Sequence, residues 1–182
     1  LNSFMKILVL YSSTDGHTTK ICSFLTKKLQ KNHLVEMTKI NNDEKFNFST
    51  YDFIIIGASI RYGSYRKIFL KFINENYFDL QKSTTAFFSV NIVARKKEKN
   101  SINTNPYIKK FYKLSKWKPN IVEVFAGKLD YSKYNFFNKN IIRFIMWITK
   151  GPTSTDTVIE FTDWNKVEKF AKNIDNFQLK KK

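Results

Sequence analysis

The sequence predicts an α/β fold, a three-layer sandwich in which helices cover both faces of a five-stranded parallel sheet. Three observations lead to this prediction. Short apolar runs alternate with amphipathic stretches along the chain. The run Asp52–Ala58 is apolar on both faces, as a central strand of a parallel sheet requires. A hydroxyl-rich loop with one glycine, Ser12–Thr18, joins the first apolar run to the first helical stretch, which is the layout of an anion site.

Each predicted element has its own local signal. The predicted strands are Met5–Ser12, Leu34–Ile40, Asp52–Ala58, Thr84–Val90 and Ile121–Leu129. The predicted helices are Thr18–Lys31, Arg66–Tyr77, a third that starts at Asn105 and Pro106, and a last that Thr162 and Asp163 cap. In the first helix Ile21, Leu25 and Leu29 recur at the spacing of one helical face. The run Leu34–Ile40 alternates only weakly, which is typical of an edge strand.

The composition indicates one folded domain, residues 1–182, with a lysine-rich end at 178–182 that we expect to be frayed. The 182 residues are 42% hydrophobic and 16% aromatic, which excludes a disordered protein. The single cysteine, Cys22, excludes an internal disulfide, and two histidines are too few to predict a metal site. The formal net charge of +17 favours an anionic partner such as a phospholipid surface. No nucleic-acid-binding module is recognisable, so no nucleic acid is expected.

Three loops form the expected site, because ligands of such folds bind beyond the carboxyl ends of the strands. The loop Ser12–Thr18 offers hydroxyl groups and a helix start to a phosphate, although it is neither a Walker loop nor a Gly-x-Gly-x-x-Gly motif. The loop Ser59–Tyr65 offers an apolar and aromatic wall for a flat ring. The loop Ser89–Arg95 offers backbone and amide donors for the polar edge of that ring.

Several distinctive motifs follow one another from Met5 to the last helix. They are Ser-Thr-Asp-Gly-His-Thr at 13–18, Ile-Gly-Ala-Ser-Ile-Arg-Tyr-Gly at 56–63, Phe-Ser-Val-Asn-Ile-Val-Ala-Arg-Lys at 88–96, Trp-Lys-Pro at 117–119, Ala-Gly-Lys-Leu at 126–129, Lys-Gly at 150–151, Thr-Asp-Thr at 155–157 and Thr-Asp-Trp at 162–164. In these motifs the sequence resembles the menaquinone-dependent protoporphyrinogen oxidases (protoporphyrinogen IX dehydrogenases), a long-chain flavodoxin-like family of bacterial haem synthesis. The resemblance covers the whole domain and implies a flavodoxin-like sheet with the strand order 2-1-3-4-5.

The resemblance implies a flavin enzyme that needs neither a catalytic side chain nor a metal. FMN would take hydride from protoporphyrinogen IX, and a membrane quinone, menaquinone or ubiquinone, would accept the electrons. The expected cofactor-binding residues are Ser13, Thr14, Asp15, Gly16, His17, Thr18, Ser59, Ile60, Arg61, Tyr62, Gly63, Phe88, Ser89, Val90, Asn91, Ile92, Arg95, Thr155 and Asp156. Asp15 is expected to cap the amides of the first helix, because an acid beside a phosphate would repel it. The cations expected to bind the propionates of the substrate are Arg61, Arg95, Lys96 and Lys97.

A long insertion, about 130–161, precedes the last helix. Its centre, 136–148, is mostly apolar but is too short and too charged to span a bilayer. Two interpretations stay open. It forms either a core helix that covers the sheet, or a surface helix that rests on the membrane with Phe144, Trp147 and Ile148 and admits a quinone or a porphyrinogen. The second places the protein peripherally on the cytoplasmic face of the bacterial inner membrane. We expect the polar turn 151–156 to close over the flavin.

Two other functions stay open at this point. One is a soluble electron-carrier flavodoxin, which predicts an acidic rim around the flavin and is at odds with the basic composition. The other is an NAD(P)H:quinone oxidoreductase, which predicts rapid bleaching of the flavin by NADPH.

Overall fold

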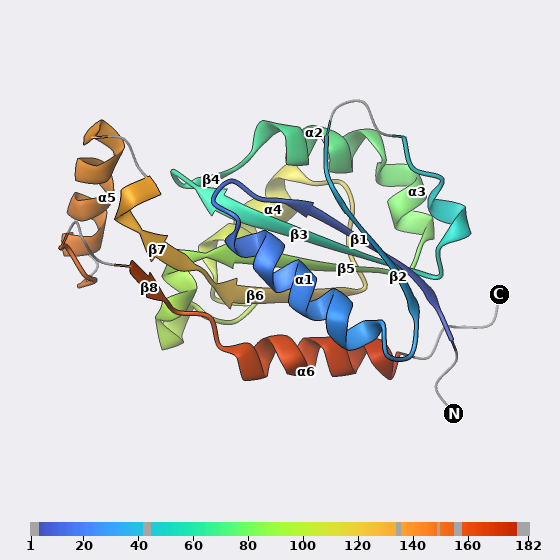
Figure 1. Ribbon diagram of the computed structural model, residues 1–182. Coiled ribbons are helices and arrows are strands. Elements are labelled where there is room, and N and C mark those ends of the chain that lie inside the picture. Colours follow the sequence, from blue (N-terminus) through green and yellow to red (C-terminus); the bar gives the residue numbers. More distant parts are fainter. Residues whose placement is uncertain (1–3, 42–44, 134–135, 149, 155–157, 178–182) are drawn as a thin grey trace.

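A central parallel sheet organises the chain (Figure 1). The computed structural model describes residues 4–41, 45–133, 136–148, 150–154 and 158–177. The parallel strands are β1 (Lys6–Ser12), β2 (Leu34–Lys39), β3 (Phe53–Arg61), β5 (Thr85–Asn91) and β6 (Ile121–Ala126). They lie in the order β2-β1-β3-β5-β6, which confirms the predicted order and the predicted edge position of the second strand.

Two layers of helices bury the two faces of this sheet. The helices α1 (His17–Leu29) and α6 (Trp164–Asp175) cover one face, and α2 (Lys67–Glu75), α3 (Tyr77–Lys82) and α4 (Pro106–Leu114) cover the other (Figure 1). Alternate residues of β3 serve the two layers, since Ile55 packs in one cluster with Leu25 and Ile56 packs in the other with Phe69. Burial on both faces explains the continuous apolar runs of the central strands. The helix predicted over 66–77 corresponds to α2, and α3 is a second helix that begins where the predicted one ends.

The chain departs from the predicted strands at two turns. After β3 it folds back into the short β4 (Ser64–Tyr65), so that part of the second predicted loop is a hairpin. The strand predicted over 121–129 breaks at Gly127, beyond which β7 (Lys128–Asp130) leaves the sheet and pairs antiparallel with β8 (Val158–Glu160). The N–H of Gly127 donates to the carbonyl of Asn91 at 3.2 Å, and its carbonyl accepts from the N–H of Phe161 at 3.0 Å. These two bonds hold the break in place.

The insertion forms the helix α5 (Phe136–Ile148), which lies beyond the end of the sheet next to β7 and β8 (Figure 1). Met146 of this helix packs with Leu129 and Tyr131 in a small cluster of its own. The interpretation of the insertion as a core helix that covers the sheet is therefore wrong. Within the described residues, no helix is long and apolar enough to cross a membrane.

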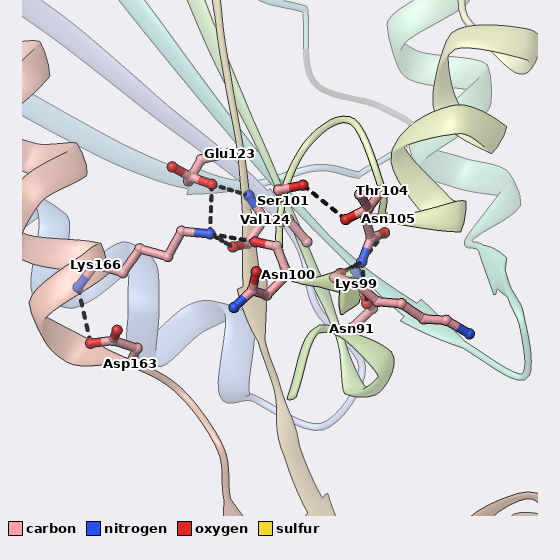
Figure 2. Close-up of polar contacts among 10 residues, drawn as sticks. All are labelled: Asn91, Lys99, Asn100, Ser101, Thr104, Asn105, Glu123, Val124, Asp163 and Lys166. Carbon is pink, nitrogen blue, oxygen red and sulfur yellow. Dashed lines mark hydrogen bonds and ion pairs between the residues drawn. The ribbon is translucent and has the colours of Figure 1, made fainter. Parts of the chain in front are cut away.

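The loop between β5 and α4 is held from two sides (Figure 2). On one side the ammonium group of Lys166 donates to the carbonyls of Asn100 and Val124, both at 2.8 Å, and forms an ion pair with Glu123 at 2.8 Å. On the other side the amide of Asn105 donates to the carbonyl of Lys99 at 2.8 Å. This double attachment fixes the segment that follows β5.

Short 3-10 turns cover Phe48–Thr50, Ile92–Arg95, Lys97–Lys99 and Tyr131–Lys133.

Gly57 lies in the middle of β3 against the ring of Phe88, and this contact yields a stability prediction. A Cβ atom at Gly57 would lie 2.3 Å from Cζ of Phe88. The ring has little room to retreat, because Phe125 and Phe170 pack against it with centroid distances of 5.4 and 6.0 Å. We expect Gly57→Ala to lower the free energy of unfolding by about 1–3 kcal/mol in equilibrium urea denaturation. The same substitution should cost less in a Phe88→Leu background. An unchanged midpoint for Gly57→Ala would contradict the packing described.

Candidate functional site

The three predicted loops meet at the carboxyl ends of β1, β3 and β5, where they line a cavity of about 340 Å³. The first loop and the start of α1 contribute Ser13, Asp15, His17 and Thr18. The β3–β4 hairpin contributes Ser59, Ile60, Arg61, Tyr62 and Gly63. The end of β5 contributes Val90 and Asn91, and the turn after it contributes Ile92 and Val93. A cavity of this size is typical of a site for a small organic ligand.

Other lining residues come from parts of the chain that the sequence analysis did not assign to the site. They are Tyr107 of α4, the stretch Gly127–Leu129 at the start of β7, and Ile141, Ile142 and Met146 of α5. The Ala-Gly-Lys-Leu motif at 126–129 is the signal that could have identified the β7 residues. For α5 the sequence offers only apolar character, which does not distinguish a cavity wall from a core or membrane face.

One end of the cavity is built to receive an anion. The helix α1 begins after Gly16, which adopts a left-handed conformation with φ of 85°, and among the described residues no side chain caps its first amides. Those amides have no hydrogen-bond partner within the helix, and they lie at the positive end of its dipole. The hydroxyl of Thr18, in the first turn, is buried with the residue 1% exposed and has no hydrogen-bond partner within the described residues. A buried hydroxyl left without a partner on a cavity wall indicates that a polar ligand belongs there.

Asp15 does not cap α1 as expected. Its carboxylate accepts a hydrogen bond from the guanidinium of Arg61, on the opposite wall, and forms an ion pair with it. The pair links the first loop to the hairpin. It also neutralises the carboxylate, which explains how an acid can lie beside an anion site.

His17 ties the start of α1 to the chain entering α6. Its Nε2 lies 2.6 Å from the hydroxyl of Thr162, which in turn donates to the carbonyl of Ala126 at 2.7 Å. Because the hydroxyl proton is used on Ala126, the imidazole is the donor in the first bond. Burial lowers the pKa of His17, the carboxylate of Glu160 opposes this effect, and the charges of Lys20 and Lys128 add to it. The imidazole is therefore neutral at pH 7.

The tip of the hairpin supplies a wall in a strained conformation. Tyr62 and Gly63 have positive φ angles of 49° and 75°. For tyrosine this backbone conformation is unfavourable and tends to occur where function requires it. The guanidinium of Arg61 lies 4.9 Å from the centroid of the Tyr62 ring and donates to its hydroxyl at 3.2 Å. The aromatic side chain is thus held at the mouth of the cavity.

The segment after β5 contributes less side-chain chemistry than predicted. The Asn91 side chain is fully engaged, since its oxygen accepts from the N–H of Ala94 and its amide donates to Ser89 and Asn105. Phe88 does not line the cavity but lies in the core between the sheet and α6. Ser89 is buried behind the wall, where its hydroxyl accepts from Tyr65 at 2.9 Å. The cavity is therefore lined here by the end of β5 and by Ile92 and Val93 of the turn that follows it.

The cations predicted near Arg95 also lie outside the cavity wall. The Arg95 guanidinium packs against Gly151, lies 6.0 Å from the centroid of the Phe161 ring and donates to the carbonyl of Ile92 at 3.1 Å. It therefore packs against the turn that follows α5, on the side away from the cavity lining. Lys96 and Lys97 are on the adjacent turn, and Lys97 is exposed. The backbone of Thr14 and Gly16 shapes the first loop, whereas Thr155 and Asp156 lie outside the described residues.

A cavity at the carboxyl edge of a β2-β1-β3-β5-β6 sheet, with an uncapped helix start at one end, defines the flavodoxin class of proteins. The family model described as "Flavodoxin domain" matches residues 8–156. Solved structures with lower similarity include a flavoprotein in complex with FMN from Lactobacillus acidophilus NCFM, 15% identical with a TM-score of 0.47 over 66% of this chain and 93% of that chain. Another is oxidised flavodoxin 1 from Bacillus cereus, 15% identical with a TM-score of 0.44 over 66% of this chain and 84% of that chain.

Within this class the chain belongs to the family of the quinone-dependent protoporphyrinogen IX dehydrogenases. A protein of that name from Leishmania major is 40% identical over 168 residues, which cover 91% of this chain and 73% of the relative. The protein of that name from Escherichia coli K12 is 38% identical over 171 residues, which cover 93% of this chain and 94% of the relative. The resemblance expected from the motifs is confirmed.

The residues at the anion end fit the phosphate of FMN. The Thr18 hydroxyl is an unused donor, the first amides of α1 are uncapped, and the charge of Asp15 is balanced by Arg61. The aromatic hairpin and the apolar side chains of α5 flank the remaining volume, as a flat ring system requires. The cofactor itself supplies the redox chemistry when it is bound.

The lowered pKa of His17 predicts how stability depends on pH. Between that lowered value and the ordinary value of 6.5, the unfolded chain binds more protons than the folded chain. The free energy of unfolding should therefore fall as the pH drops through this window. His17→Gln keeps a donor for Thr162 but does not titrate, so its pH slope should be smaller. Urea denaturation from about pH 5 to pH 7.5 measures both slopes, and equal slopes would contradict the half-buried, neutral state of His17.

Proposed function

We propose that this chain oxidises protoporphyrinogen IX to protoporphyrin IX with FMN as its cofactor and a quinone as the electron acceptor. One observation carries the proposal: the cavity built on the uncapped start of α1 occurs in a chain that is 38–40% identical to enzymes of this name over almost its whole length. The porphyrinogen loses hydride equivalents and protons, and the quinone receives the same electrons. The reaction belongs to porphyrin and haem synthesis.

The side chains of this chain bind, orient and shield. The Thr18 hydroxyl and the amides of α1 bind the phosphate, and the Tyr62–Gly63 tip together with Val90 and Ile92 flanks the ring. Ile141, Ile142 and Met146 close the cavity from the α5 side and exclude water. The buried Asn91–Asn105 pair, with the amide of Asn105 donating to Asn91 at 3.1 Å, keeps the segment after β5 in place.

We assign Arg61 as the contact for a propionate of the substrate. Among the four cations expected for that role, it is the one on the cavity wall, at the mouth beside Tyr62. Its planar guanidinium can hold a carboxylate by two parallel hydrogen bonds. Asp15 already occupies part of the guanidinium, so an incoming propionate shares or displaces this partner.

The outer face of α5 suits an anionic membrane surface. Phe144, Trp147 and Ile148 are 58%, 69% and 59% exposed, and Arg143 and Lys150 are exposed beside them. Apolar side chains next to cations are the usual features of a helix that lies in a membrane interface. The opposite face of α5 lines the cavity. We propose that the protein rests with α5 on the cytoplasmic face of the membrane, where quinone and porphyrinogen both dissolve.

The redox assignment is tested by mixing the yellow holoprotein with protoporphyrinogen IX under anaerobic conditions. We expect the flavin absorbance near about 450 nm to bleach and porphyrin fluorescence to appear, because hydride leaves the substrate for the cofactor. Adding a quinone should restore the absorbance. NADPH in place of the porphyrinogen is the control. Bleaching by NADPH with no response to the porphyrinogen would contradict the proposal and favour a quinone reductase.

The membrane proposal is tested with Trp147→Ser/Ile148→Ser and liposomes that contain anionic lipid. Removing two exposed apolar side chains should lower the partition coefficient between liposomes and water by at least about tenfold. The matched control is Phe78→Ser/Tyr112→Ser, which removes exposed aromatic side chains from α3 and α4. Unchanged sedimentation of the first variant, or equal loss in both, would refute the role of α5.

A further inference from the structure

Lys128 is the cation of β7 that reaches the cavity, and neither the motifs nor the proposed mechanism gives it a role. Its side chain is 33% exposed. Arg61, by comparison, belongs to the hairpin and is paired with Asp15. The two positive charges therefore lie on different walls of the cavity.

The register of the small sheet determines which way Lys128 faces. Lys128 lies directly opposite Glu160 of β8, so the two side chains are on the same face of this sheet. Glu160 accepts hydrogen bonds from Lys20 of α1 at 2.7 Å and from the indole of Trp164 at 2.6 Å. That face is thus turned toward the start of α1. The neighbouring Leu129 packs on the other face, against Met146.

Electrostatics agree with this placement. The charge of Lys128 contributes to lowering the pKa of His17, after the larger effects of burial and Glu160. Lys128 therefore lies close enough to act on the first residue of α1, where the amides are uncapped and the hydroxyl of Thr18 has no partner.

Lys128 can leave its present partner at little cost. Its ammonium group lies 3.4 Å from the carboxylate of Asp130. The other oxygen of Asp130 accepts from both the hydroxyl and the N–H of Ser132. Asp130 therefore keeps two hydrogen bonds when Lys128 turns away. Lys20, by contrast, is held by Glu160.

We propose that Lys128, on β7 just before the insertion, is the counter-ion of the cofactor phosphate at the start of α1. The inference rests on the proposed function for the identity of the cofactor. It adds that β7, which leads into the insertion, is part of the phosphate site. An ammonium group on a compact phosphate is a charge-assisted contact that weakens with salt.

The test compares FMN with riboflavin, which has the same ring system but no phosphate. Affinities are measured by quenching of flavin fluorescence on titration with wild type, Lys128→Gln, Lys128→Arg and Lys113→Gln. Lys113→Gln removes one positive charge from an exposed site on α4 and controls for net charge. We expect Lys128→Gln to weaken FMN binding by about tenfold and riboflavin binding by less than about twofold. Lys128→Arg should restore most of the FMN affinity. Salt should weaken FMN binding less in Lys128→Gln than in wild type.

Three results would overturn the inference. The first is that Lys128→Gln weakens FMN and riboflavin binding equally. The second is that the FMN affinity of Lys128→Gln equals that of Lys113→Gln. The third is that Lys128→Gln changes only the KM for protoporphyrinogen, which would assign Lys128 to the substrate. Each of these leaves FMN binding by the wild type intact. If the wild type binds neither flavin, the proposed function itself fails, so the two failures are distinguishable.

Discussion

The site depends on the start of α1, which has no side-chain cap within the described part of the chain. The helices α4 and α6 are capped by Asn105 and Asp163, each accepting from two backbone amides, whereas α2 and α3, like α1, have no such cap among the described residues. Of these three uncapped starts, the one at α1 lines the cavity, and Gly16 takes the left-handed conformation there. Unpaired amides near a buried hydroxyl are unfavourable unless an anion completes them. The unpaired amides and the Thr18 hydroxyl lie at one end of the cavity. They therefore determine at which end the anionic group of a ligand binds.

The walls around this end differ in how they are held. The segment after β5 is fixed by buried hydrogen bonds of Asn91 and Asn105 and by the Lys166 clamp. The side formed by β7, β8 and α5 rests on a small cluster around Leu129 and Met146. Stability is distributed unevenly in folded proteins, and elements with few buried contacts open most readily. The side formed by the segment after β5 is therefore the more firmly held one, and the side formed by β7, β8 and α5 has the fewer buried contacts.

The elements and the three loops are predictable because they depend on local patterns: apolar runs, a Ser/Thr-rich loop, and Asn105 before proline. The sheet order follows from the resemblance to flavodoxin-like proteins. The sequence could not predict contacts that arise only when loops meet. The pairing of Asp15 with Arg61 joins residues 46 positions apart, and local reasoning gave Asp15 to the helix amides. Phe88 is expected in the site because it begins the motif at 88–96, and since its strand is buried on both faces, alternation does not reveal that its ring lies in the core. The break at Gly127 likewise follows from a bond to Asn91 on another strand.

The insertion could not be interpreted from its sequence because α5 is apolar on more than one face. A helix of that kind is usually buried on every side. Here one face closes the cavity with Ile142 and Met146, while Phe144 and Trp147 are exposed on another. An exposed apolar face costs free energy in water, and larger faces of this kind mark interaction sites. In the membrane arrangement proposed above, lipid would cover this face while the other face of α5 closes the cavity. That arrangement would account for both apolar faces of the helix and would shorten the path of a lipid-soluble quinone to the ring.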